Sequence, residues 1–352
     1  MKRVVLAIDS FKGCLSSVEA EAAAEAGVRE HLRDTEVVRI PVTDGGDGML
    51  GVFSQLLDCK KITVGCHDAL MRPIRAVYGV SADGTVILET ASACGISLLR
   101  KQELNPLHTT TYGVGELFAD ALRRGFRRFV VGLGGSATCD CGLGMLAALK
   151  DAFGAGWHDR LPQNLDVTLA SDVDNPLLGE QGAAAVFAPQ KGATPQMAAS
   201  LERRARTFAR MAAAHLGHDR SWDRGAGAAG GLGYAFLQFM DAKAKSGADI
   251  LLETAGFDKI VDGADLIVTG EGSADEQTLM GKISGRVLEY GIRKRVPVML
   301  IAGRVSGAEA LLHAGFTYVK CITPLGMPLE EAMRPAVAKE NIRKALAEED
   351  LP

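Results

Sequence analysis

The two ends of the chain repeat one pattern of apolar and polar positions. Near the N-terminus, "RVVLAI" is apolar and β-branched, and the Ala- and Glu-rich "SSVEAEAAAEAGVREHL" follows it, with Ser16 or Ser17 as the N-cap of a helix. "EVVRIPV" is a second apolar run. The last part of the chain has the same rhythm in "ADLIVTG", "SGRVLEYGIRKR", "VPVMLIAG", "GAEALLHAG" and "TYVKCITP". Short apolar strands separated by helices predict a parallel sheet with helices on both faces.

The middle of the chain has a different pattern. "KKITVGCHDALMRPIRAVYGVSADGTVILETAS" alternates polar and apolar residues around a turn signal at Asp83-Gly84, which predicts antiparallel hairpins. "TYGVGELFADALRRG" predicts a helix, and "RRFVVGLGG" predicts a strand that runs into a glycine turn. "MAASLERRARTFARMAAAHLG" predicts a long helix that Gly217 ends. The middle is therefore expected to form a mixed sheet.

These two patterns predict an α/β protein with two domains, which suits a length of 352 residues. We expect a discontinuous parallel-sheet domain, residues 1–60 plus 255–352. An inserted mixed-sheet α/β domain, residues 61–254, would interrupt it.

Composition narrows the class of protein. Apolar residues make up 47% and charged residues 23% of the chain, as in soluble globular proteins, and a net charge of -4 gives no basic field to attract nucleic acid. No stretch approaches the roughly 18 apolar residues of a membrane span. The 7 cysteines, odd in number and irregularly spaced, indicate no disulfide framework and favour a reducing cytoplasm. The sequence is compatible with a homo-oligomer but does not indicate one.

Candidate chemistry gathers where predicted strands end. Ligands of parallel α/β sheets bind at the carboxyl ends of strands. Such ends carry glycines, acids and a lysine, in "AIDSFKG", "PVTDGGDGM" and "IVTGEGSADEQT". A lysine beside a helix N-terminus suits an anion, and paired acids suit Mg²⁺ or a proton. Ordinary turn chemistry is the alternative explanation. The candidates from these three turns are Asp9, Ser10, Lys12, Asp44, Asp47 and Glu271.

The predicted inserted domain adds further candidates. Thr109 and Thr110 in "HTTTYGVGE" could offer donors to a ligand, or simply cap a helix. Asp172 and Asp174 in "LASDVDNPLLG" could share a divalent cation, or form a turn before a proline. Lys191 in "FAPQKGAT" could meet a phosphate. Arg72 and Arg75 could clamp a carboxylate, although solvated surface arginines are the simpler interpretation.

Several familiar motifs are absent or misleading. No complete phosphate-loop motif occurs, and "LMGKIS" lacks the required first glycine. "GAGAAGG" matches the dinucleotide pattern at Gly225, Gly227 and Gly230, but no strand leads into it. Cys139 and Cys141 form a lone C-x-C, which fits neither a zinc site nor a redox pair. By pattern alone the chain is predicted to be a two-domain enzyme for a phosphorylated ligand and a metal.

Eight segments together resemble the bacterial type I glycerate kinase family. They are "DSFKG", "PVTDGGDG", "ETASACGISLL", "TTTYGVGEL", "GLGGSATCDCGLGML", "SDVDNPLLGEQGAAAVFAPQKGA", "GAGAAGGLG" and "VTGEG", in family order from about residue 4 to residue 305. The resemblance implies ATP-dependent phosphorylation of D-glycerate, generally to 2-phosphoglycerate. It also implies a Rossmann- or flavodoxin-like domain, a second inserted α/β domain, and an active site in the cleft between them.

The resemblance also suggests roles for the candidates. Lys12 and Lys191 would neutralise anionic charge, Asp44 or Asp47 would be the general base, and Asp172 and Asp174 would hold Mg²⁺. Glu271 would be a second base or metal candidate. The remaining expected site residues lie in the glycine loop and are Gly134, Gly135, Ser136, Thr138 and Asp140.

The sequence departs from the family pattern at several points. Cys139 and Cys141 replace Asn and Gly, and Ser273 and Ala274 stand where Arg and Leu are usual. The loss of the arginine leaves open a kinase for another small hydroxy acid. A non-catalytic sensor of small anions on the same scaffold is a second alternative, against which the retained acids argue. If Cys141 has kept the backbone geometry of a glycine, its φ will be positive, which marks strain.

Overall fold

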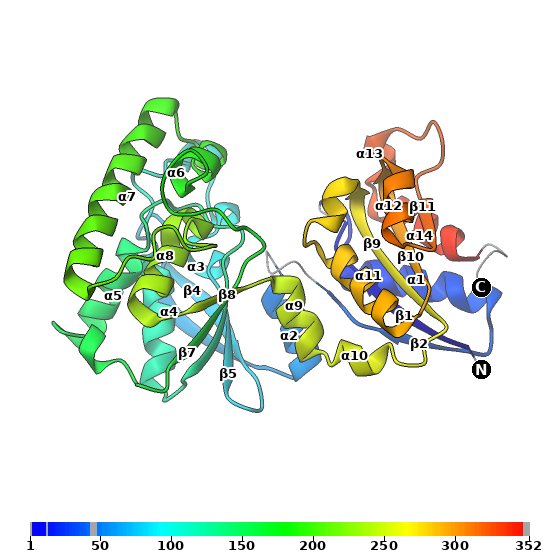
Figure 1. The fold of residues 1–352 in the computed structure, drawn as a ribbon, viewed down its shortest axis with the longest axis horizontal. Coiled ribbons are helices and arrows are strands. Elements are labelled where there is room, and N and C mark those ends of the chain that lie inside the picture. The colour runs from blue at the N-terminus through cyan, green and yellow to red at the C-terminus, as the bar shows by residue number, and fades with distance from the viewer. Residues whose placement is uncertain (1, 12, 43–47, 348–352) are drawn as a thin grey trace. The chain divides into compact units, whose positions relative to one another are not determined.

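The computed structural model of the protein describes residues 2–11, 13–42 and 48–347 (Figure 1). The chain divides into two compact units. The first unit consists of residues 1–44 and 248–352, and the second unit of residues 45–247. Each unit is built around its own sheet.

The first unit contains a five-stranded parallel sheet in the order β11-β10-β9-β1-β2. Its strands are β1 (Lys2–Ile8), β2 (Thr35–Arg39), β9 (Leu266–Ala274), β10 (Val298–Val305) and β11 (Tyr318–Cys321). Its helices are α1 (Ser17–His31), α9 (Gly247–Thr254), α10 (Phe257–Ile260), α11 (Ile283–Lys294), α12 (Ala308–Ala314), α13 (Leu329–Ala332) and α14 (Pro335–Ala347), with a short 3₁₀ turn η5 (Glu276–Leu279). The parallel sheet predicted from the two ends of the chain is confirmed.

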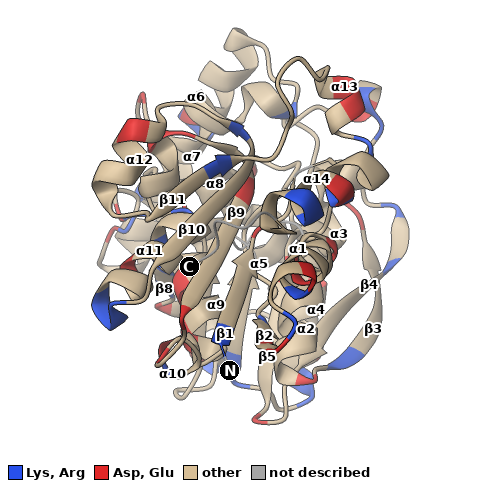
Figure 2. Cartoon of the chain, turned by 90° about the vertical axis from the view of Figure 1, so that its right-hand side faces the viewer, with Lys and Arg blue, Asp and Glu red and all other residues tan. Residues whose placement is uncertain are grey.

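Helices α1 and α14 cover one face of this sheet. Ser16 caps α1 with a capping box to Glu19, as its sequence predicted. The helix has Gly27 where α14 crosses it, because a Cβ there would lie 2.2 Å from the carbonyl oxygen of Arg343. Alternate residues of β1 and β9 complete a core with both helices. Figure 2 shows acidic residues on the short helix α13 and both basic and acidic residues on α14.

The second unit contains a six-stranded mixed sheet in the order β3-β4-β5-β6-β7-β8. Its strands are β3 (Lys60–His67), β4 (Pro73–Val80), β5 (Thr85–Glu89), β6 (Arg128–Gly132), β7 (Asp166–Ala170) and β8 (Lys243–Lys245). The first three are antiparallel, as the alternating pattern predicted, and β5 to β8 are parallel. The carboxyl ends of β5, β6 and β7 therefore lie side by side, and Thr90 N donates to Gly132 O at 3.0 Å.

Helices of very different lengths pack around the second sheet. They are α2 (Met49–Leu57), α3 (Ala91–Cys94), α4 (Tyr112–Arg123), α5 (Leu143–Phe153), α6 (Ala183–Phe187), α7 (Pro195–Leu216) and α8 (Ala228–Met240), with the 3₁₀ turns η1 (Ile96–Leu98), η2 (Lys101–Glu103), η3 (His158–Arg160) and η4 (Pro189–Lys191). The long predicted helix is α7, which Gly217 ends with φ 77°. The Phe118 ring lies 4.4 Å from that of Phe129 and 5.5 Å from that of Phe236, at the centre of the core.

Helix α2 belongs to the second unit by its contacts. It packs on β5 and β4, and Leu50 N donates to Glu89 Oε1 at 2.8 Å. The division expected from the sequence, near residue 60, placed this helix in the first domain. Within the described ranges, no helix has the length and apolar character needed to cross a bilayer.

Candidate active site

A glycine loop, residues 133–142, joins β6 to α5 in the second unit. Two backbone bonds fix it to the segment after β5, from Ile96 N to Gly135 O and from Ala137 N to Cys94 O, each 2.8 Å long. Gly135 is exposed, with φ 72°, and Ser136 and Thr138 are buried. The backbone at 134–135 is therefore the part of this loop that a ligand can reach.

Lys191 lies beneath this loop. Its side chain is only 3% exposed, and Nζ donates to Ser136 Oγ at 2.9 Å and to Thr138 O at 2.7 Å. Burial lowers the pKa of Lys191, and the nearby Cys139, Cys94 and Asp140 act in the opposite direction. The lysine expected to meet a phosphate thus holds the loop from its buried side.

Asp140 is half-buried and accepts several hydrogen bonds from the protein itself. Its carboxylate accepts from Thr111 N at 2.8 Å and Thr111 Oγ1 at 2.9 Å, and from the backbone of Gly142 and Gly144 at 3.1 Å each. Thr110 Oγ1 lies 3.4 Å away, and Thr109 Oγ1 donates to the carbonyl of Ala137. These hydroxyls, expected to serve a ligand, connect α4 to the glycine loop.

The two cysteines of the loop are buried thiols in a tightly packed turn. Cys141 has φ 55°, so a non-glycine residue occupies the left-handed region. Burial raises the pKa of Cys139 and of Cys141. A Cβ on Gly230 would lie 1.9 Å from the carbonyl oxygen of Thr138. Gly230 and Gly231 are glycines because their backbone packs directly on this loop, with Gly231 against Cys141.

The acids proposed as metal ligands follow β7. Asp172 and Asp174 are both exposed. Asp172 Oδ1 accepts from Gly247 N at 3.1 Å, and Asp174 Oδ2 pairs with Arg224 at 2.5 Å. In the described part of the chain, no group of three or more His, Cys, Asp or Glu side chains could hold a metal. An ion here would need ligands from its own nucleotide or from water, as Mg²⁺ commonly does.

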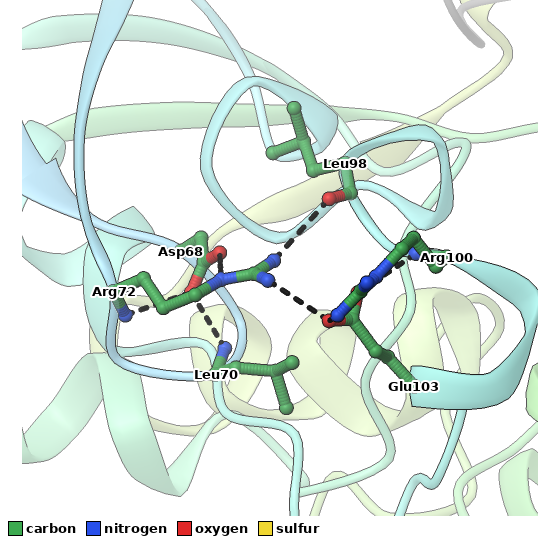
Figure 3. A network of polar contacts seen from close by, with 6 residues as sticks. All are labelled: Asp68, Leu70, Arg72, Leu98, Arg100 and Glu103. Carbon is green, nitrogen blue, oxygen red and sulfur yellow. Dashed lines mark hydrogen bonds and ion pairs between the residues drawn. The ribbon is translucent and has the colours of Figure 1, made fainter.

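Arg72 is committed to a network within the protein (Figure 3). Its Nε donates to buried Asp68 at 2.6 Å, and its two terminal nitrogens reach Glu103 at 3.1 Å and the carbonyl of Leu98 at 3.4 Å. Arg100 also binds Glu103, at 2.7 Å. These bonds join the β3–β4 turn to η1 and η2. Arg72, which was considered as a carboxylate clamp, therefore has a structural role here.

The first unit carries candidates just after β1 and in the last part of β9. Asp9 N donates to Gly270 O at 2.8 Å, and Ser10 N donates to Asp9 Oδ1 at 2.7 Å. Glu271 is buried and pairs with Lys282 Nζ at 2.9 Å. Lys12, Asp44 and Asp47, the expected catalytic residues, lie outside the described residues.

A sequence model described as "Glycerate kinase family" matches residues 4–155 and 154–348. The chain belongs to the glycerate kinase family. It is therefore an enzyme of the glycerate kinase class, a phosphotransferase that acts on an alcohol group. The resemblance inferred from its motifs is confirmed.

Relatives of known name in this family match almost the whole chain. Glycerate kinase of Bacillus subtilis (strain 168) is 39% identical over 95% of this chain and 94% of its own. Glycerate 2-kinase of Escherichia coli (strain K12) is 34% identical over 98% of each chain. A crystal structure assigned to glycerate kinase 2 of Salmonella typhimurium LT2 superposes with a TM-score of 0.84 at 33% identity, covering 98% of this chain and 96% of that one. The α/β fold with one parallel and one mixed sheet is thus that of a glycerate kinase structure.

Two residues of this glycerate kinase fold were missed from the sequence. Lys282 lies in "LMGKIS", the incomplete phosphate loop, and was not among the candidate site residues. Glu21 is buried on α1, where burial raises the pKa of its carboxyl to about 9. The burial of Glu21 could have been found from the helical spacing, because Ser17, Glu21 and Val28 lie on one buried stripe of α1.

Proposed function

We propose that the protein transfers the γ-phosphoryl group of ATP to a hydroxyl of D-glycerate, which gives 2-phosphoglycerate and ADP. Family membership supports glycerate as the acceptor. The observation that carries the rest is the glycine loop after β6, with exposed backbone at Gly135 and the buried cation of Lys191 below it. Such a loop can receive a phosphate through backbone N–H groups, and phosphoryl transfer depends mainly on positioning and charge neutralisation.

The proposed roles follow from the geometry of each residue. Gly134 and Gly135 would bind phosphate through their backbone, while Ser136 and Thr138 would support it through Lys191. Asp140, Thr109 and Thr110 would keep the loop in place on α4. This division separates residues that touch the ligand from residues that position the loop.

Mg²⁺ would neutralise phosphate charge when bound with ATP. Asp172 and Asp174 are the carboxylates we propose to hold it, because both are exposed beside the glycine loop's strand. Asp174 would have to exchange Arg224 for the ion. Asp44 or Asp47 is the proposed general base, with Lys12 as a cation for the substrate, as "PVTDGGDG" and "DSFKG" suggest.

The decisive experiment is an assay of ADP release from Mg-ATP with D-glycerate, with NMR identification of the phosphorylated hydroxyl. Lys191→Met should lower kcat/KM by about 100-fold or more, because the loop loses two hydrogen bonds and a buried cation. Lys150→Met is the matched control, since Lys150 is exposed on α5. Absence of ADP release from the unaltered protein would refute the proposal and favour an anion sensor.

A second candidate function rests on the altered residues at the end of β9. Ser273 and Ala274 follow "TGEG", so the acceptor pocket could suit another small hydroxy acid. A panel of hydroxy acids in the same assay tests this. A higher kcat/KM for any acid other than glycerate would favour it.

A further inference from the structure

The carboxyl ends of β1 and β9 lie at the point where the first sheet changes direction. From β1 the chain continues to β2 on one side, and β9 later joins on the other side, in the order β11-β10-β9-β1-β2. Ligands of open parallel sheets bind at such a switch point, beyond the carboxyl ends of the strands. Asp9 N bonds to Gly270 O at 2.8 Å, so the end of β1 lies beside Gly270, and β9 continues from there to Ala274.

Glu271 supplies a buried acceptor at this place. The residue is 8% exposed, and its Oε2 pairs with Lys282 Nζ at 2.9 Å. Its Oε1 is buried and has no hydrogen-bond partner among the residues that the structure describes. An acceptor left in this state is destabilising, and more so when it is charged. A ligand that brings a hydroxyl donor would remove this cost.

Lys282 adds a positive charge beside that acceptor. It is the N-cap of α11, and its side chain is 38% exposed, so a ligand can reach it while it remains paired with Glu271. The first N–H groups of a helix have no intrahelical acceptor and carry partial positive charge. The buried oxygen and the cation at this helix N-terminus therefore suit a ligand with a hydroxyl next to an anionic group.

We propose that Glu271 and Lys282 form a binding site for a small hydroxylated anion in the first unit. Glu271 Oε1 accepts a hydrogen bond from the ligand's hydroxyl, and Lys282 with the first turn of α11 neutralises its anionic group. The inference rests on the proposed function, in which two ligands have this chemistry. One is the hydroxy acid, and the other is the nucleotide, through its ribose and phosphate.

Calorimetric titration of the full-length protein with D-glycerate, and separately with ADP, tests the site. Glu271→Gln and Lys282→Met should each weaken binding of one of these ligands by about tenfold or more. Lys294→Met is the matched control at the other end of α11, where the lysine pairs with Asp258 at 2.9 Å, and it should leave both affinities within about twofold. Thermal unfolding midpoints verify that each variant is folded. If Glu271→Gln does not fold, the titrations of Lys282→Met alone test the site.

Each outcome of the titrations decides the inference. Loss of D-glycerate affinity assigns the site to the hydroxy acid, and loss of ADP affinity assigns it to the nucleotide. Unchanged affinity for both ligands in Lys282→Met overturns the site. The ADP-release assay of the unaltered protein keeps the two proposals apart. If the unaltered protein releases ADP and the variants bind both ligands normally, only the proposed binding site is refuted. If the unaltered protein releases no ADP, the proposed function is refuted.

Discussion

Replacing Glu21 by Gln should abolish a pH dependence of the first unit's stability. Glu21 is 1% exposed, its Oε1 accepts from Ile8 N at 3.4 Å, and burial raises its pKa to about 9 from 4.5. Between these values the folded state keeps the proton that the unfolded chain releases. The contribution of Glu21 to the free energy of unfolding is therefore fully present at low pH. It falls as pH rises between these values, by about 1.4 kcal/mol per pH unit.

From pH 5.5 to pH 7.5 this effect amounts to at most about 3 kcal/mol. Gln is neutral at both pH values, so the variant should lack this part of the slope. Its amide group introduces donors that need acceptors, but that cost is the same at every pH. The difference between the slopes of the two proteins, rather than the difference in stability at one pH, therefore reports the carboxyl.

Hydrogen exchange of peptides from β1 and α1 is the suitable assay. Both tryptophans, Trp157 and Trp222, lie in the second unit, so their fluorescence does not follow the first. The ratio of protection between variant and unaltered protein cancels the pH dependence of exchange itself. Glu25→Gln, on the same helix and paired with Arg29 at 2.8 Å, is the control and should leave the slope unchanged. Parallel slopes for Glu21→Gln and the unaltered protein would refute the reasoning.

Three further predictions concern the second unit. Gly230→Ala should destabilise it by at least about 3 kcal/mol, because the added Cβ would lie 1.9 Å from a carbonyl oxygen. Gly217→Ala is the control, because Gly217 also has a positive φ but has open space around it, and it should cost only about 1 kcal/mol. Both values are measured from the urea unfolding transition followed by tryptophan fluorescence. In the same measurement, Asp140→Ala should cost about 2–4 kcal/mol, since several hydrogen bonds to a charged group are lost, and a change below about 0.5 kcal/mol would contradict this. Brief alkylation at neutral pH should label exposed Cys321 before Cys139, which is buried with a raised pKa, as mass spectrometry of peptides would show; equal labelling would mean that the loop opens.

Local patterns predicted the elements of this fold well because each is a local signal. The stripe of apolar residues and the terminal Gly217 identified α7, and the alternating residues before and after Asp83-Gly84 identified β3 to β5. The parallel sheet of the first unit followed from apolar runs separated by helices. Such signals depend on neighbours within a few residues along the chain.

The uses of individual site residues could not be predicted in the same way. Asp140 was expected to serve a ligand, but its partner Thr111 lies 29 residues away in sequence. Lys191 binds atoms of residues 136 and 138, more than 50 residues before it. No local pattern records such pairs, so the sequence could propose candidates and could not divide ligand contacts from supports.

The supports explain how the glycine loop keeps one shape. Lys191 holds it from below, Asp140 fixes it to the start of α4, and Gly230 allows a second backbone to pack against it. Holding Cys141 at φ 55° costs of order 1 kcal/mol, and such a conformation persists only where its surroundings determine it. A loop determined from three directions keeps the backbone near Gly135 oriented before any ligand arrives. Preorganised donors of this kind cost no reorganisation during the reaction, which is the property that a phosphate-binding loop requires.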